Sequence, residues 1–270
     1  MINVNTIPWL LRIEAWLLVS VLFGLMLMFI WIGSMTGQRR RKERPDYHDN
    51  PSNNTIYGSV FGLLAFLLAF TFSMSGNRFD ARRLASIKES NDISTAILRA
   101  DLYPDSDRVV LRNYFKLYLQ ARIDFLTAGT DLKKVVEAWN GAKLQSDHLW
   151  KHVSDFYRRN NTTVITGQMV PALNNMFDSA NSNKYSELMH VPASIVSMLF
   201  ILTLVASFYA GYVSVGKGRF DWFIAVGFCL LISVVIYITL DLDRPRRGLI
   251  QMDTSHEAII EIMQQFEKDP

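Results

Sequence analysis

The sequence predicts an all-α fold: a polytopic membrane protein with four transmembrane helices and a helical soluble domain inserted between the second and the third. Half of the 270 residues are hydrophobic, and they gather in four uncharged blocks instead of spreading along the chain. The stretch between the second and third blocks is charged, and its apolar residues recur at helical spacing. We expect a first transmembrane pair with a basic loop over 1–75, a helical soluble domain over 76–190 that continues from the second transmembrane helix without a break, a second transmembrane hairpin over 191–240 and a tail over 241–270.

Each apolar block reaches the roughly 20 residues that a helix needs to cross hydrocarbon. Hydrocarbon offers no partner to a free backbone N–H or C=O, so these spans must be helical, and four of them cannot close a barrel. The first block does not resemble a secretory signal, because Met1–Trp9 carry no Lys or Arg and the block exceeds a signal's roughly 7–15 apolar residues. The four blocks are Ala15–Gly33, Ile56–Ser75, Val191–Gly216 and Trp222–Leu240.

The soluble domain is predicted to be helical throughout. A helix over Asp80–Leu102 stops before Pro104, and a second one, capped by Asp105 or Ser106, ends at Gly129. A third runs from Asp131 to about Arg159, and Thr162–Asn183, which contains Pro171, is expected to be a broken helix leading to a loop. The apolar residues expected to form its core are Leu84, Ile87, Ile93, Ile97, Leu98, Val109, Tyr114, Leu117, Tyr118, Phe125, Val135, Trp139, Leu149, Val153 and Phe156.

Small residues in the spans indicate close helix packing. The link between the third and fourth spans is only a few residues long, so these two helices should be antiparallel neighbours. Ala206, Ala210 and Gly211 in the third span would let a neighbouring helix approach, as would Gly58 and Gly62 in the second.

The second span carries a patterned face. At about 100° per residue, two aromatic residues one turn apart share one stripe with small or polar residues at both ends. Such a stripe suits a narrow, partly wet pathway that hydrophobic rings can gate by dewetting. Packing of the same stripe against neighbouring helices explains the periodicity equally well. The members of the stripe are Ser59, Gly62, Phe66, Phe70, Ser73 and Asn77.

A family resemblance favours the first of these interpretations. The run Phe66-Leu67-Leu68-Ala69-Phe70-Thr71-Phe72, followed by Asn77-Arg78-Phe79, resembles the second transmembrane helix of bestrophins. The segments Asn77-Arg78-Phe79-Asp80-x-Arg82-Arg83, Glu89-x-Asn91 and Asp241-x-Asp243-Arg244-Pro245-x-x-Gly248-Leu249-Ile250 resemble the bacterial bestrophin-like family of unknown function, DUF4239. The resemblance extends to the order of spans and soluble domain over nearly the whole chain.

The resemblance implies a pentameric anion channel with a neck of aromatic rings on the second helix. Phe66 and Phe70 match the two neck aromatics, and Gly62 stands where the family has a larger aliphatic residue, which would leave the first ring wide. Bestrophins hold calcium with a continuous acidic run after the fourth span. Asp241 and Asp243 do not form such a run, and a calcium site usually needs six or more oxygen ligands. We therefore predict no metal site and no cofactor.

Charged residues flank the second and fourth spans and could line a vestibule or latch the helices together. Asp80 continues the stripe, whereas Arg78 and Arg82 point away from it, so selectivity does not follow from the sequence. The arginines could instead form salt bridges with Glu89, Asp92 or Asp241 within a helical bundle. Arg244 could pair with Asp241 or with lipid phosphate, and we favour a structural latch over an ion site for the group Arg78, Asp80, Arg82, Glu89, Asp241, Asp243 and Arg244.

Other classes of function find little support. No nucleophile elbow, catalytic carboxylate pair or phosphate-binding loop is present, so we do not expect an enzyme. His148, His152 and Asp155 could share a helical face, but they lack the fourth ligand of a metal site. The net charge of +3 is too small to indicate nucleic-acid binding, and the single Cys229 lies inside a span.

Two hypotheses follow from the sequence. The first is a homo-oligomeric, pentameric ion channel in the bacterial inner membrane, whose partners are the lipid bilayer and small inorganic ions. The second is a membrane-anchored helical scaffold or sensor with no conduction path. Orientation does not follow from charge, because Arg39-Arg40-Arg41-Lys42, Arg44 and Lys217–Arg219 on one side nearly balance the arginines on the other. The resemblance to bestrophins implies a cytoplasmic central domain.

Overall fold

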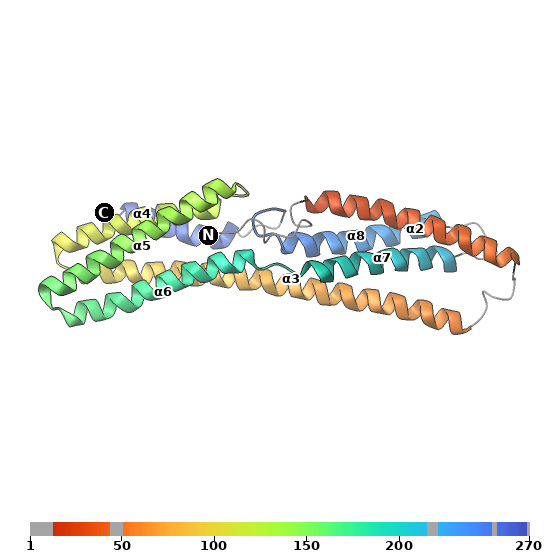
Figure 1. Cartoon of the computed structure of the whole chain (residues 1–270). Coiled ribbons are helices and arrows are strands. Elements are labelled where there is room, and N and C mark those ends of the chain that lie inside the picture. The colour runs from red at the N-terminus through yellow and green to blue at the C-terminus, as the bar shows by residue number, and fades with distance from the viewer. Residues whose placement is uncertain (1–12, 44–50, 215–220, 250–252, 269–270) are drawn as a thin grey trace. The chain divides into compact units, whose positions relative to one another are not determined.

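The computed structural model describes residues 13–43, 51–214, 221–249 and 253–268, and in these ranges the secondary structure is helical (Figure 1). Arg44, Lys217 and Arg219, counted above for orientation, lie outside the described residues. The helices are α2 (Ala15–Glu43), α3 (Pro51–Ala100), α4 (Asp105–Thr127), α5 (Leu132–Asn160), α6 (Thr163–Leu188), α7 (Ala193–Val213), α8 (Trp222–Leu242) and α9 (Asp253–Lys268).

Four stretches are long and apolar enough to cross a membrane: Ala15–Arg40, Thr55–Ala100, Thr163–Val213 and Trp222–Leu242. Each contains one predicted block, apart from the end of the third block, which falls outside the described residues. The second stretch is part of one 50-residue helix, α3, which continues from apolar into charged sequence without a break. The predicted fold class, an all-α membrane protein with four spans, is confirmed.

The chain forms two compact units. The first holds α2, α3 up to Asn77, and His190–Arg244 with α7 and α8. The second holds α3 from Arg78 onward, α4, α5 and α6, and the tail from Pro245 with α9. The tail from Pro245 therefore groups with the central helices.

Close backbone contact holds the first unit together. A Cβ built on Gly211 of α7 would lie 2.0 Å from the carbonyl oxygen of Ile30 in α2, and one built on Gly33 would lie 2.1 Å from that of Phe208. Only glycine lets the two backbones approach this closely. The predicted role of Gly211 is confirmed, whereas a Cβ on Gly58 or Gly62 would meet nothing within 4 Å among the described residues.

The second unit has its own apolar core, in which α4 packs against α5 and α9 and α5 packs against α6. The α5 prediction holds: Asp131 caps the helix by accepting from the backbone N–H groups of Lys133 and Lys134. The predicted cap of α4 is wrong, because Asp105 is already helical and the backbone carbonyl of Pro104 accepts the first helical bonds. Gly129, at φ 57°, follows the end of α4 as expected.

The prediction of a broken helix over Thr162–Asn183 is also wrong, because α6 runs unbroken through Pro171 to Leu188. A proline inside a helix removes one backbone hydrogen bond, but Ala172 and Leu173 beside it are buried in the core. The polar end of the segment also faces inward: Asn183 is fully buried and hydrogen-bonds to a carboxylate. Tertiary contacts therefore override the weak helical propensity of this stretch.

Part of the predicted core is exposed. Leu84 and Leu98 of α3 and Val109 and Leu117 of α4 are largely solvent-accessible in the single chain. The predicted residues Ile93, Tyr118, Phe125, Val135, Leu149, Val153 and Phe156 are buried. Helical spacing alone did not distinguish the inward face of α3 and α4 from apolar residues that point away from this chain's core.

Candidate functional site

The predicted stripe of α3 is exposed along its whole length. All six members, Ser59, Gly62, Phe66, Phe70, Ser73 and Asn77, are exposed in the part of the chain that the structure describes. Phe66 is 68% and Phe70 47% exposed. Their rings stack on each other, with centroids 6.5 Å apart and planes 15° apart. We call these six residues the α3 stripe.

The opposite face of α3 packs into the first unit. Leu64, Thr71 and Ser75 are buried, and the Phe61 ring meets that of Phe228 in α8 edge to face, with centroids 6.1 Å apart. The helix thus has one face committed to α7 and α8 and another that the described residues leave uncovered. This arrangement makes the α3 stripe available to another molecule or to a water-filled path.

The α3 stripe offers no charge inside the apolar part of the helix. Two stacked rings form its middle, hydroxyl groups lie at Ser59 and Ser73, and Gly62 leaves open space. Asp80, one turn beyond Asn77, is also exposed. Such a surface can exclude water at the rings and admit it at the ends.

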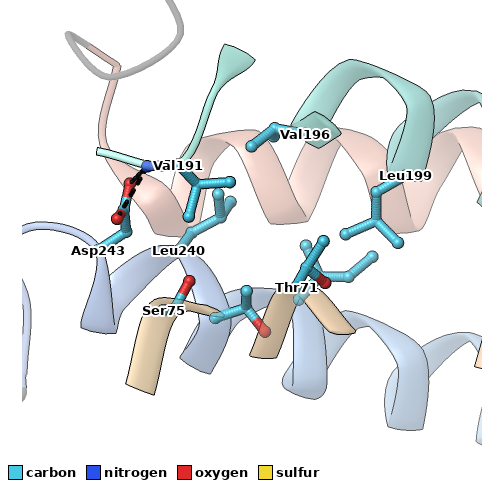
Figure 2. A pocket seen from close by; sticks show the side chains of 9 residues that line it. Thr71, Ser75, Val191, Val196, Leu199, Leu240 and Asp243 are labelled. Carbon is cyan, nitrogen blue, oxygen red and sulfur yellow. Dashed lines mark hydrogen bonds between the residues drawn. The ribbon is translucent and has the colours of Figure 1, made fainter. Parts of the chain in front are cut away.

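A polar joint lies where α7 begins and α8 ends (Figure 2). Both carboxylate oxygens of Asp243 accept from the backbone N–H of Val191, at 3.1 and 2.9 Å. The ring Nδ1 of His190 lies 2.9 Å from the carbonyl oxygen of Asp243 and 3.7 Å from its carboxylate. Asp241 and Arg244 beside it are also buried, and Arg244 donates to the carbonyl oxygen of Ile13.

Glu89 is the centre of a buried network in the second unit. Its two oxygens accept from Nε and Nη2 of Arg122 in α4, the latter at 2.8 Å, and neither side chain is exposed. The side-chain amide of Asn183 in α6 donates to the same carboxylate at 2.7 Å. The Arg122 guanidinium also lies 4.6 Å from the centre of the Phe125 ring. One residue of α3 is thereby bonded to α4 and α6.

A second pair completes this network from the tail. Arg246 donates to Glu187 of α6 at 2.8 Å and to the carbonyl oxygens of Phe125 and Gly129 at 3.0 and 3.2 Å. Its guanidinium carbon lies 4.6 Å from the centre of the Phe125 ring. Phe125 therefore contacts two arginines, Arg122 and Arg246, each of which is paired with a buried glutamate.

Burial sets the ionisation of Glu187. It raises the pKa of this carboxyl above the ordinary value of 4.5, although attraction to Arg246 and Arg122 acts in the opposite direction. For Arg122, burial lowers the guanidinium pKa, but attraction to Glu89 outweighs burial and the net shift is upward. The network therefore holds Arg122 firmly charged and makes the charged form of Glu187 costly.

The predicted latch residues occupy different environments. Asp241, Asp243 and Arg244 lie in the first unit, whereas Arg78, Asp80, Arg82 and Glu89 lie in the second. Arg82 is buried and donates to the carbonyl oxygen of Met189, and Asp92 pairs with Lys88. Burial of Arg82, Glu89, Asp241, Asp243 and Arg244 favours structural roles over the lining of an aqueous vestibule.

Sequence reasoning missed the main partners in the second unit: Arg122, Asn183, Glu187 and Arg246. A signal existed in α4, because Arg122 lies between Tyr118 and Phe125 on its apolar face. A charge at such a position is buried only when it is paired. The rings of His148 and His152 both pack near Tyr114, and His152 lies 3.0 Å from Asp107.

Comparison with known proteins finds one matching family and several solved structures with a similar fold. The family model of the bestrophin-like domain matches residues 18–256. A crystal structure of a bacterial bestrophin homolog from Klebsiella pneumoniae matches with a TM-score of 0.71 at 12% identity, covering 93% of this chain and 99% of that one. A structure of a mutant of that homolog matches with a TM-score of 0.71 at 10% identity, covering 93% and 99%, and a second mutant with 0.70 at 11%, covering 92% and 98%.

No curated protein sequence matches this chain. At such low sequence identities, the crystal structures establish the fold of this chain and nothing further. The match covers nearly the whole length of each crystallised protein. The family match covers most of the sequence, including the α3 stripe and the buried networks of both units. The chain therefore belongs to the bestrophin-like family.

Proposed function

We propose that this protein is a homo-oligomeric ion channel, a pentamer, in which α3 of each subunit faces a common axis. The observation that supports this most directly is the uncovered α3 stripe, with Phe66 and Phe70 stacked at its middle. Rings of Phe from several subunits would form a hydrophobic neck that gates by dewetting. Membership of the bestrophin-like family supports the same assembly.

We further propose that the permeant ion is an anion such as chloride, which the resemblance to bestrophins implies and which membership of the bestrophin-like family supports. The six residues of the α3 stripe carry no charge, so the neck itself would select weakly and charges at its ends would bias the choice. Asp80, exposed one turn beyond the stripe, would oppose anion entry. Gly62 would leave the outermost ring of the neck wide, because it presents no side chain.

The proposal is tested by conductance of the purified protein in planar bilayers. Phe66→Ala and Phe70→Ala should each increase current and alter gating, because removing a ring widens the neck and lets water enter. Phe72→Ala is the matched control: Phe72 is also an exposed aromatic of α3, but it lies roughly 120° away from the stripe at 100° per residue. Unaltered currents in both stripe variants would show that the neck lies elsewhere.

Ion choice is measured in the same bilayers. Under a KCl gradient, the reversal potential should fall on the chloride side of zero, and Asp80→Asn should move it further in that direction. A reversal potential on the potassium side would contradict anion conduction while leaving the neck assignment intact.

The alternative is a scaffold or sensor that does not conduct. It predicts a monomer or dimer in which the α3 stripe is packed against protein and closed. The two are distinguished by the mass of the purified protein in detergent: five subunits would support the channel, and one or two subunits would support the scaffold.

We propose that the protein resides in the bacterial inner membrane with its central domain in the cytoplasm. Asn140 on the exposed face of α5 offers a reporter, since Cys229 is buried. An Asn140→Cys variant should react with a membrane-impermeant maleimide only after the cells are broken. Labelling in intact cells whose outer membrane is permeabilised would place the domain on the other side.

A further inference from the structure

A small cavity lies in the first unit between α3, α7 and α8, next to the polar joint (Figure 2). Its volume is about 10 Å³, close to the roughly 10–15 Å³ that one water molecule needs by the same measure. Aliphatic side chains form most of the wall, and four side chains contribute oxygen atoms. The lining residues are Thr71, Ser75, Val191, Val196, Leu199, Ile236, Thr239, Leu240 and Asp243.

The hydroxyl of Ser75 has no hydrogen-bond partner among the described protein groups, and the residue is 0% exposed. The two threonines of the cavity differ in this respect. Thr71 donates to the carbonyl oxygen of Leu67 and Thr239 to that of Val235, each at 2.8 Å within its own helix. A buried hydroxyl without a partner is costly, so Ser75 needs a group that the protein itself does not supply.

Asp243 needs the same kind of group. Its carboxylate is 2% exposed and, among the described residues, accepts a hydrogen bond from the backbone N–H of Val191 alone, while Nδ1 of His190 lies 3.7 Å away, beyond hydrogen-bond distance. A carboxylate offers about four lone-pair positions, so further donors can be accommodated. A buried charge that is incompletely hydrogen-bonded is unfavourable. Ser75 and Asp243 line the same cavity. One small molecule that can both donate and accept hydrogen bonds would satisfy the two side chains.

We propose that one water molecule occupies this cavity and bridges Ser75 of α3 to Asp243 after α8. It donates to the Asp243 carboxylate and hydrogen-bonds to Ser75 Oγ, with the Thr71 and Thr239 oxygens available as further acceptors. The bridge holds the buried face of α3 to the start of α7 and the end of α8. A metal cation would need more oxygen ligands than this largely aliphatic wall presents. The proposal is independent of whether the protein conducts ions.

Substitution of Ser75 distinguishes a hydrated cavity from a dry one by the sign of the effect. Ser75→Val fills the space and removes the hydroxyl. If a water is bound, valine displaces it and leaves Asp243 with fewer donors, so the unfolding midpoint of the purified protein should fall by about 2–4 °C. If the cavity is dry, valine removes an unpaired hydroxyl and fills a void, so the midpoint should rise.

Two further variants complete the test. Ser75→Ala removes the hydroxyl but leaves room for the water on Asp243, so its midpoint should fall less than that of Ser75→Val. Ser194→Val, at an exposed serine of α7, measures the general effect of this substitution in a helix. A rise for Ser75→Val relative to this control would overturn the proposal, whatever the result for Ser75→Ala.

A density map that resolves water provides a direct measurement. The wild-type map should show a peak within hydrogen-bond distance of Ser75 Oγ and one Asp243 oxygen, and the peak should be missing from Ser75→Val. A map with no such peak, or with a peak surrounded by five or more oxygens at metal distances, would contradict a bound water even if Ser75→Val does not fold.

Discussion

Glu89 and Arg122 form an ion pair in which neither side chain is exposed to solvent. Glu89 lies on α3, the helix that carries the α3 stripe, and Arg122 lies on α4. Two parallel hydrogen bonds fix the guanidinium against the carboxylate, and Asn183 adds a third donor. The continuation of α3 is therefore held by charge as well as by apolar packing.

Breaking this pair should strongly destabilise the protein. Glu89→Gln leaves the Arg122 charge buried without its counter-ion, which should cost about 3–5 kcal/mol. The comparison is Asp101→Asn, which breaks the partly exposed Asp101–Arg112 pair and should cost at most about 1 kcal/mol. Unfolding in detergent, followed by tryptophan fluorescence, measures both. If both variants lost the same small amount of unfolding free energy, the buried pair would stabilise the protein no more than a partly exposed pair does.

The ionisation of Glu187 should make stability depend on pH. Its folded-state pKa is raised above 4.5 by burial, so the folded protein binds the proton more tightly than the unfolded chain. The resulting stability is fully present below about pH 4.5 and is lost as the pH rises through the raised folded-state pKa. Wild type should therefore lose stability relative to Glu187→Gln as the pH is raised across this window.

Exposed Glu137 of α5 provides the control for this pH dependence. Glu137→Gln should follow the wild-type curve, whereas the wild-type and Glu187→Gln curves should diverge as the pH rises. Parallel curves for wild type and Glu187→Gln would mean that the Glu187 carboxyl does not titrate differently in the folded state.

The contact between α2 and α7 should tolerate no side chain at Gly211. Its Cβ would lie 2.0 Å from the Ile30 carbonyl oxygen, and backbone cannot move aside as a side chain can. Gly211→Ala should therefore cost about 1–3 kcal/mol or more. Gly227→Ala in α8, where a Cβ meets nothing within 4 Å among the described residues, should be neutral or stabilise by up to about 1 kcal/mol. The midpoints of thermal unfolding of the two variants, measured against wild type, test this difference. Equal midpoints would contradict it.

The two aspartates near the starts of α4 and α5 should differ in effect. Asp131→Ala removes a side chain that accepts from two backbone N–H groups at the start of α5, which should cost about 1 kcal/mol. Asp105→Ala removes no cap, since Asp105 is itself helical and pairs with Arg108. It should cost only a few tenths of a kcal/mol. A larger loss for Asp105→Ala would reverse the assignment of the cap.

The fold could be predicted from the sequence to a large extent. A hydrocarbon core about 30 Å thick requires runs of apolar residues, and a backbone in that core must be helical, so four spans follow from composition alone. The α5 helix also followed, because Asp131 and the apolar spacing from Val135 to Phe156 agree. The six residues that share one face of α3 followed from the angle between residues in a helix, which needs no knowledge of the partner helices, whereas their exposure did not.

The candidate site could be predicted only in part, because burial depends on where helices meet. Leu84 and Leu98 have the spacing of core residues but are 65% and 69% exposed. Asn183 stood at the end of the predicted broken helix and Glu187 lay beyond it, yet both are buried, because the Glu89 carboxylate and the Arg246 guanidinium from other elements complete their hydrogen bonds. The α6 helix continues past Pro171 for the same reason: packing compensates for a lost backbone bond.

The sequence by itself determined the four spans, the single long helix α3 and the face on which Phe66 and Phe70 lie, since these depend on hydrophobicity and on helical geometry. Tertiary structure decided the rest. It brought Glu89 to Arg122 and Arg246 to Glu187, and it placed Gly211 against the backbone of α2. Such contacts join residues far apart in the chain, and the free energy of pairing buried charges depends on distances that no local pattern encodes.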